Sequence, residues 1–159
     1  MNDESARARW TTLYVDAFPR VYRALAAALL DAEAARDALQ DAFEEGVRHP
    51  PTDERNLPGW LYRVAFRKAR RSLLRRPRSV PLTANLAAPD TNAATLEHIE
   101  VGRLLALLTE RQRAVVVAHY YLGLSHSDLA ELLGISRGTV GATISQSVSR
   151  MRKGTIDVW

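Results

Sequence analysis

The chain has 159 residues and no cysteine, which excludes disulfide bonds and thiolate metal sites. Its 22 basic and 18 acidic residues give a net charge of +4. No apolar run approaches the roughly 18 residues needed to cross a bilayer, and the N-terminus lacks the apolar core of a signal peptide. We therefore expect a cytoplasmic protein without membrane association, built as one medium domain or two small ones.

The pattern along the chain predicts an all-α fold. Alanine and leucine are abundant, glycine and proline collect between periodic segments, and no stretch alternates with the period of a β-strand. Pro19 suits a first helical turn, Asp31 is placed to cap a helix, and Asn56 to start one. The predicted helices span residues 5–17, 19–30, 32–48, 57–75, 95–107, 110–121, 126–133 and 137–152.

The helix predicted at residues 32–48 has an apolar side and an acidic side. The apolar side consists of Ala35, Leu39, Phe43 and Gly46, and the opposite side carries Glu33, Asp37, Gln40, Asp41 and Glu44. Like charges four residues apart weaken an isolated helix by roughly 0.2–0.5 kcal/mol per pair. The acidic side is therefore either a solvated surface or a docking surface for a basic protein partner.

The helix predicted at residues 57–75 is basic on one side. Eight basic residues and no acidic one lie between Arg63 and Arg78, which favours a polyanionic partner. Trp60, Arg63, Arg67 and Arg71 follow one another at helical spacing, so an aromatic ring stands at the head of an arginine row. That combination suits single-stranded nucleic acid, because cations follow the phosphates while a base stacks on the ring. In the alternative, Trp60 packs on a neighbouring helix and the arginines are solvated.

A predicted boundary divides the chain. Residues 77–94 contain three prolines and no helical periodicity, which is typical of a flexible, mostly extended linker. We therefore expect two small helical domains, at residues 1–76 and 95–159. Neither is large enough for a generous core, so each should gain stability by binding a partner.

Residues 123–151 predict a helix-turn-helix, a unit whose second helix enters the DNA major groove. Ser125 and Asp128 form a capping-box-like start, Gly134 suits the left-handed end of the first helix, and Ser136 caps the second. The apolar residues of the second helix, Val140, Ile144, Val148 and Met151, share one side. The opposite side carries Ala142, Ser145, Gln146 and Ser149. An ordinary αα-hairpin is the alternative.

No chemistry of catalysis is visible in the sequence. The four histidines show no metal-ligand spacing, and there is no nucleophile–base pair or phosphate-binding glycine loop. We expect no catalytic residue, no metal, no cofactor and no small-molecule substrate, and hence no enzyme.

Three segments, in order, resemble the extracytoplasmic-function sigma factors of bacteria. DAEAARDALQDAFEEGVR (residues 31–48) is similar to the helix of region 2 that docks on RNA polymerase. PGWLYRVAFRKARRSLLRR (58–76) is similar to the part that handles the −10 promoter element. LLALLTERQRAVVVAHYYLGLSHSDLAELLGISRGTVGATISQSVSRMR (104–152) is similar to region 4, which reads the −35 element.

This resemblance implies a protein that binds core RNA polymerase, directs it to promoter DNA and assists promoter opening. The loop 49–56 would accept a base flipped from the opened strand. The implied polymerase-binding residues are Asp37, Gln40, Asp41 and Glu44, and the implied −10 residues are Asn56, Trp60, Arg63, Arg67, Lys68 and Arg71. The implied −35 residues are Arg137, Thr139, Gly141, Ala142, Thr143, Ser145, Gln146 and Arg150. Relatives are commonly held inactive by an anti-sigma factor, which makes such a protein a further expected partner.

The sequence departs from the family at two places. Arg67 and Arg71 stand where relatives usually carry Asn and Asp, and the recognition helix lacks the usual basic and aromatic residues. Gln146 could pair with adenine, but Ala142 offers only a methyl contact. We expect weak or unusual −35 reading, with affinity from phosphate contacts and from attachment to polymerase. Two alternatives remain open: a sigma-like regulator or antagonist that docks on polymerase without recognising promoters, and a free-standing helix-turn-helix regulator.

Overall fold

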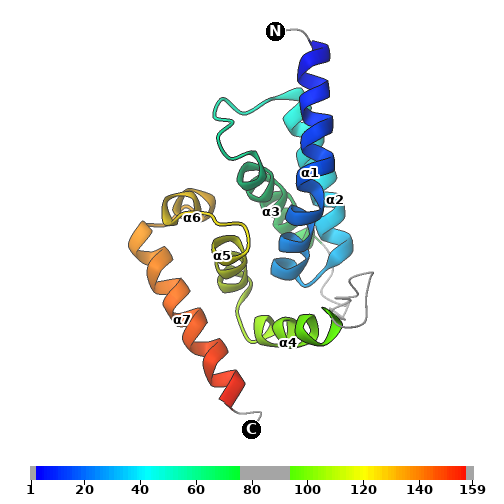
Figure 1. Ribbon diagram of the computed structural model, residues 1–159. Helices are drawn as coiled ribbons and strands as arrows, with labels where there is room; N and C mark the ends of the chain where they lie inside the picture. The colour runs from blue at the N-terminus through cyan, green and yellow to red at the C-terminus, as the bar shows by residue number, and fades with distance from the viewer. Residues whose placement is uncertain (1–2, 76–93, 157–159) are drawn as a thin grey trace.

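The computed structural model describes residues 3–75 and 94–156, and side chains from residue 99 onward in the second range. Within these ranges every regular element is an α-helix, as predicted (Figure 1). The helices are α1 (Asp3–Leu29), α2 (Ala32–Arg48), α3 (Leu57–Arg75), α4 (Ala94–Ala106), α5 (Glu110–Tyr120), α6 (His126–Leu133) and α7 (Arg137–Ile156). None of these helices is long and apolar enough to cross a membrane. The linker predicted at residues 77–94 lies, except for Ala94, outside the described residues.

The first two predicted helices are one. The sequence pattern predicted a break at Pro19, but α1 continues through it from Asp3 to Leu29. A proline inside a helix removes one backbone hydrogen bond, to the carbonyl four residues earlier. That carbonyl belongs to Val15, which is 67% exposed, so water can reach this side of the helix. Phe18 and Tyr22, on either side of the proline, stack on each other and hold the helix together.

Local capping follows the sequence in the first half of the chain. The side chain of Asp31 accepts a hydrogen bond from the backbone N–H of Ala34 (3.0 Å) and caps α2. The side chain of Asn56 accepts one from the N–H of Gly59 (2.9 Å) at the start of α3. Both caps were predicted, because a cap depends on residues three positions apart.

The first half has its own aromatic core. α1 packs on α2, and α2 on α3, and Figure 1 shows α1 and α2 side by side. The Trp10 ring lies edge-on to Phe43 and to Trp60, with centroid distances of 6.3 and 5.9 Å. Gly46 is buried under this ring, and a Cβ atom there would collide with the indole. A small residue on α2 therefore lets the first three helices close around Trp10.

The two halves also pack against each other, which the sequence did not predict. α5 contacts α1, and Ala114 and Val115 of α5 are fully buried within one continuous cluster that includes both halves. The Tyr62 hydroxyl of α3 donates a hydrogen bond to the Ala114 carbonyl (2.9 Å), and the phenol is fully buried. Burial raises the pKa of Tyr62 well above its usual value, so the hydroxyl remains a donor. The second half is thereby held against α3.

Candidate nucleic-acid interface

The last two helices form the predicted helix-turn-helix. Ser125 and Asp128 make a reciprocal capping box, with backbone-to-side-chain distances of 3.0 and 3.1 Å. Gly134 ends α6 in the left-handed conformation (φ 64°). The Ser136 hydroxyl accepts a hydrogen bond from the N–H of Thr139 (3.1 Å) and caps α7. Each of these predicted local features is confirmed.

One side of α7 faces the core and the other is exposed. Val140 and Ile144 are buried, and Val148 and Met151 are partly buried, as the helical period predicted. Ser147 is also fully buried, which the pattern missed; its hydroxyl donates to the Thr143 carbonyl (2.6 Å). The predicted DNA-facing residues that are exposed are Arg137, Thr139, Ala142, Ser145, Gln146 and Arg150, while Gly141 and Thr143 are half-buried.

The exposed side of α7 offers a polar, mostly neutral surface with charge at its ends. Arg150 donates a hydrogen bond to the side-chain oxygen of Gln112 on α5 (3.2 Å). The hydroxyls of Thr139 and Thr143 are engaged within the helix-turn-helix itself. Gln146 and Ser145 are the exposed side chains at the centre of this face with polar groups able to reach base edges.

The acidic side of α2 is a separate exposed surface. Asp37, Gln40, Asp41 and Glu44 are all exposed, while the opposite side of the helix is buried against α1 and α3. Glu44 forms an exposed pair with Arg48 at 3.6 Å, one turn away. The sequence therefore predicted which side of α2 is exposed and that this side is acidic.

Two arginines in the first half of the basic side of α3 contact α6, although Arg67 remains exposed. Arg63 forms an ion pair with Glu131 of α6 (2.5 Å). Arg67 donates hydrogen bonds to the backbone carbonyls of Glu131 (3.3 Å) and Leu132 (3.5 Å). Both arginines are thus brought to the C-terminal end of α6, a contact that sequence spacing could not reveal.

The remaining predicted −10 residues have different surroundings. Lys68 pairs with Glu45 of α2 at 2.6 Å, and Arg71 is exposed. Trp60 is half-buried beside Trp10, which is the packing alternative that the sequence left open for this residue. Asn56 is exposed but uses its side-chain oxygen to cap α3.

The loop between α2 and α3 borders a polar groove. The groove has a volume of about 590 Å³ and lies between this loop, the start of α3 and α6; its lining includes Thr52, Asn56, Trp60, Arg63, Asp128 and Glu131. Within the loop, Asp53 accepts hydrogen bonds from the Arg55 side chain (2.9 and 2.7 Å) and from its backbone N–H (3.1 Å). These bonds hold the pKa of Asp53 at about 2.

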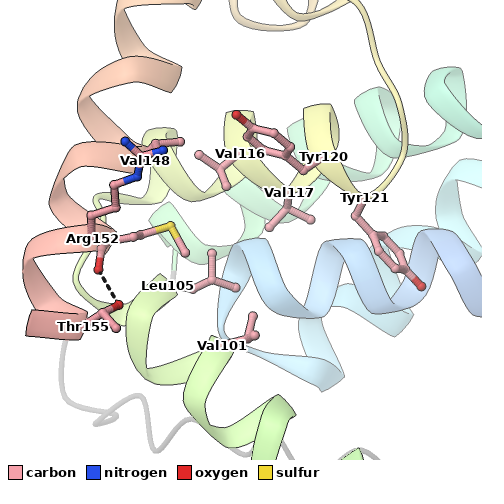
Figure 2. Close-up of a pocket in the computed structure, with 10 residues that line it drawn as sticks. Val101, Leu105, Val116, Val117, Tyr120, Tyr121, Val148, Arg152 and Thr155 are labelled. Atoms are coloured by element: carbon pink, nitrogen blue, oxygen red, sulfur yellow. Dashed lines mark hydrogen bonds between the residues drawn. The ribbon is translucent and has the colours of Figure 1, made fainter. Parts of the chain in front are cut away.

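A second, apolar hollow lies between α4, α5 and α7 (Figure 2). Its volume is about 500 Å³, and its lining is Val101, Leu105, Val116, Val117, Tyr120, Tyr121, Val148, Met151, Arg152 and Thr155. Val101, Tyr120 and Tyr121 are each at least 42% exposed. Exposed apolar residues gathered around a hollow are typical of a surface that binds another protein. Sequence reasoning missed this hollow, because three separate helices supply its walls.

A capped helix-turn-helix beside a basic helix and an acidic helix defines a DNA-binding protein of transcription. The comparisons with known proteins narrow that class. Residues 98–151 match the family model described as Sigma-70, region 4. The chain is 31% identical over 125 residues to the RNA polymerase sigma-E factor of Streptomyces coelicolor, covering 75% of this chain and 70% of that protein. It is 29% identical over 136 residues to the ECF RNA polymerase sigma factor SigL of Mycobacterium tuberculosis, covering 77% and 75%.

A solved structure shares the fold. The sigma factor RpoE of Bartonella quintana, in complex with the anti-sigma factor NepR, superimposes with a TM-score of 0.71 at 17% identity, covering 91% of this chain and 95% of that one. The region 4 match and the 31% identity to the sigma-E factor show that the chain belongs to the extracytoplasmic-function (ECF) sigma factors, which direct RNA polymerase to promoters. Sigma factors are not enzymes.

Proposed function

We propose that this sigma factor divides its work among three surfaces. The acidic side of α2 binds core RNA polymerase, the basic side of α3 holds the opened −10 strand, and α7 contacts the −35 region. It would act in the cytoplasm, where polymerase and promoter DNA meet. The observation that carries this assignment is the placement of an exposed acidic surface and a basic one on adjacent helices. An acidic surface is complementary to a basic partner, and a basic surface is complementary to an acidic partner such as DNA.

The polymerase assignment is tested by charge reversal on α2. Asp41 is exposed, so Asp41→Lys should leave the fold intact and abolish co-elution with purified core polymerase. Glu100→Lys on α4 is the matched control, because Glu100 is also exposed and the change in net charge is the same. If the polymerase retains both variants equally, the acidic side of α2 is not part of the polymerase interface.

The −10 assignment is tested by salt dependence. Arg71 is exposed on α3, so Arg71→Gln should weaken binding to a bubble-containing oligonucleotide and lower the salt slope by about 1. Arg23→Gln, at an exposed position on α1, serves as the charge-matched control. An identical slope for the two variants would contradict the role of α3.

For the −35 region, we propose that α7 binds mainly through phosphate contacts. Its exposed central side chains are short and uncharged, and Arg137 and Arg150 supply charge near its ends. Gln146→Ala should therefore change promoter affinity little, whereas Arg137→Gln should weaken it at every sequence tested. Base-specific protection that disappears in Gln146→Ala would show direct reading instead.

We also propose an anti-sigma factor as a partner. The fold relative RpoE is in complex with one. The hollow between α4, α5 and α7 could take apolar side chains from such a protein (Figure 2). Val101→Lys would place a charge at its edge and should weaken that complex, while leaving the polymerase contacts of α2 in place.

The decisive measurement of the whole proposal is run-off transcription. Purified protein added to core polymerase on a genomic promoter library should give discrete start sites. If transcription stays at the level of core polymerase alone although the unmodified chain binds polymerase, the assignment of promoter recognition fails.

A further inference from the structure

Two histidine rings lie next to each other in the second half of the chain. His119 belongs to the last turn of α5, and His126 is the first residue of α6. Their ring centroids are 5.3 Å apart, and the ring planes are inclined at 56°. Both side chains are half-buried rather than enclosed, so solvent reaches them. Neither residue has a part in the proposed contacts with polymerase or DNA.

The fold brings these two rings together across a turn. The backbone N–H of Leu124 donates to the Ala118 carbonyl (3.0 Å) and closes the segment between α5 and α6. On the other side, a Cβ atom built at Gly141 of α7 would lie 3.8 Å from the His126 ring, in ordinary contact. The pair is therefore held where three helices meet. Histidine spacing predicted no metal here, because the two ligands belong to different helices.

A hydrogen bond determines which nitrogen of His119 is available. Its Nδ1 lies 2.9 Å from the carbonyl oxygen of Leu124. A carbonyl only accepts, so Nδ1 carries the proton and donates it to this bond. In the neutral ring the lone pair is then on Nε2. Imidazoles that bind metals are commonly oriented in this way, because donation from one nitrogen to a backbone carbonyl leaves the other nitrogen as the ligand.

The separation of the two rings fits one ion between them. A tetrahedral metal about 2.0–2.1 Å from one nitrogen of each ring places the ring centroids about 5.2 Å apart. The observed distance between the centroids is 5.3 Å. The His126 ring has no hydrogen-bond partner among the described residues, so it can turn a nitrogen toward the ion without breaking a bond. Binding then needs rotation of a side chain and no movement of the helices.

We propose that His119 and His126 bind a divalent late-transition-metal ion. Neutral imidazole suits Cu²⁺, Zn²⁺ and Ni²⁺, and Cu²⁺ binds most tightly to a given set of nitrogen ligands. No group of three or more metal-ligating side chains occurs in the part of the chain that the structure describes. Water therefore completes the coordination shell, and the ion is exchangeable. Because α5 and α6 each supply one ligand, the bound ion joins them and stabilises the helix-turn-helix.

Copper binding to the full chain, without an affinity tag, tests the site. Calorimetric titration with Cu²⁺ should show one tightly bound ion, and its electron paramagnetic resonance spectrum should show coupling to two ring nitrogens. His126→Gln leaves one imidazole and should weaken binding by about a hundredfold, because two ligands on one scaffold act together. His49→Gln, at an exposed position directly after α2, is the matched control and should bind Cu²⁺ like the parent chain.

Thermal unfolding in the presence of Zn²⁺ measures the link between the two helices. An ion that binds the folded chain more tightly than the unfolded chain raises the melting temperature. Zn²⁺ should therefore raise the melting temperature of the parent chain and of His49→Gln, but not that of His126→Gln. His119→Gln should also lose the response. That variant loses the bond to Leu124 as well, so His126→Gln decides the question if His119→Gln does not fold.

Three results would overturn the proposal. If His126→Gln binds Cu²⁺ as tightly as the parent chain, the parent holds an adventitious ion only. An equal loss of affinity in His49→Gln would show binding by scattered surface histidines. Coupling to a single nitrogen in the parent chain would mean that the two rings do not share the ion. The assignments of polymerase and DNA surfaces stand or fall separately, because they use other residues.

Discussion

Arg113 is the side chain that ties the two halves together at the ends of two helices. From α5, its Nε donates a hydrogen bond to the Ala28 carbonyl in the last turn of α1 (3.0 Å). Its Nη1 donates to the Leu108 carbonyl just after α4 (2.7 Å). Carbonyls at the C-terminal end of a helix have no partner within it, and a cation is favoured there. We predict that Arg113→Met destabilises the whole fold.

The size of the effect follows from these two bonds. A hydrogen bond that involves a charged group contributes about 1.5–3 kcal/mol net. Arg113 is half-buried, so water can partly replace the lost donor. Burial also lowers the pKa of its guanidinium group. The lower end of the range applies, which gives about 3 kcal/mol for two bonds. For a protein of this length, that loss lowers the melting temperature by about 6–12 °C.

Thermal unfolding followed by far-UV circular dichroism measures this loss directly. Arg111→Met is the matched control, since Arg111 is an exposed neighbour on the same helix and should unfold like the parent chain. Arg113→Lys keeps the charge but lacks the planar fork, so it should fall between the two. If the free energies of unfolding of Arg113→Met and Arg111→Met differ by less than about 0.5 kcal/mol, the bridge between the halves does not stabilise the fold.

Three further predictions concern single positions. Gly134 has φ 64°, so Gly134→Ala should destabilise the helix-turn-helix by about 1–2 kcal/mol in urea unfolding. Gly141→Ala should instead stabilise it by about 0.8–1 kcal/mol, because a Cβ there meets the nearest atom of His126 at an ordinary 3.8 Å; a loss of stability would contradict this. Asp53 should titrate at about 2 by carboxyl NMR, and Arg55→Gln should return its pKa towards 3.8. Because this pKa is lowered, the pairing is intact above pH 3.8 and is lost as the pH falls towards 2.

Features that depend on neighbouring residues were predictable. The capping box of Ser125 and Asp128, the left-handed Gly134 and the cap at Asp31 each involve residues within three or four positions. The chain brings such residues together whatever the rest of the fold does. The exception is Pro19, where a local rule predicted a break. Tertiary packing of α1 on α2 kept the helix whole.

The apolar and charged sides of α2 and α3 could be predicted, but the residues that each side contacts could not. Helical period alone separates apolar from charged residues, and the structure confirms both divisions. It does not say that Lys68 meets Glu45, or that Arg63 meets Glu131. The basic residues of α3 lie close together in sequence, yet they pair with acidic residues on three different helices, because Arg70 also meets Glu110 of α5.

The sequence by itself determined the all-helical fold, the charge of each exposed helix side and the helix-turn-helix, because period and capping act over a few residues. Only the tertiary structure decided that α5 and α6 lie against α3 and that α4, α5 and α7 enclose an apolar hollow. Such contacts join residues of separate helices, and Tyr62 and Ala114 are more than fifty positions apart. They depend on how whole surfaces fit together, and no local pattern records that fit.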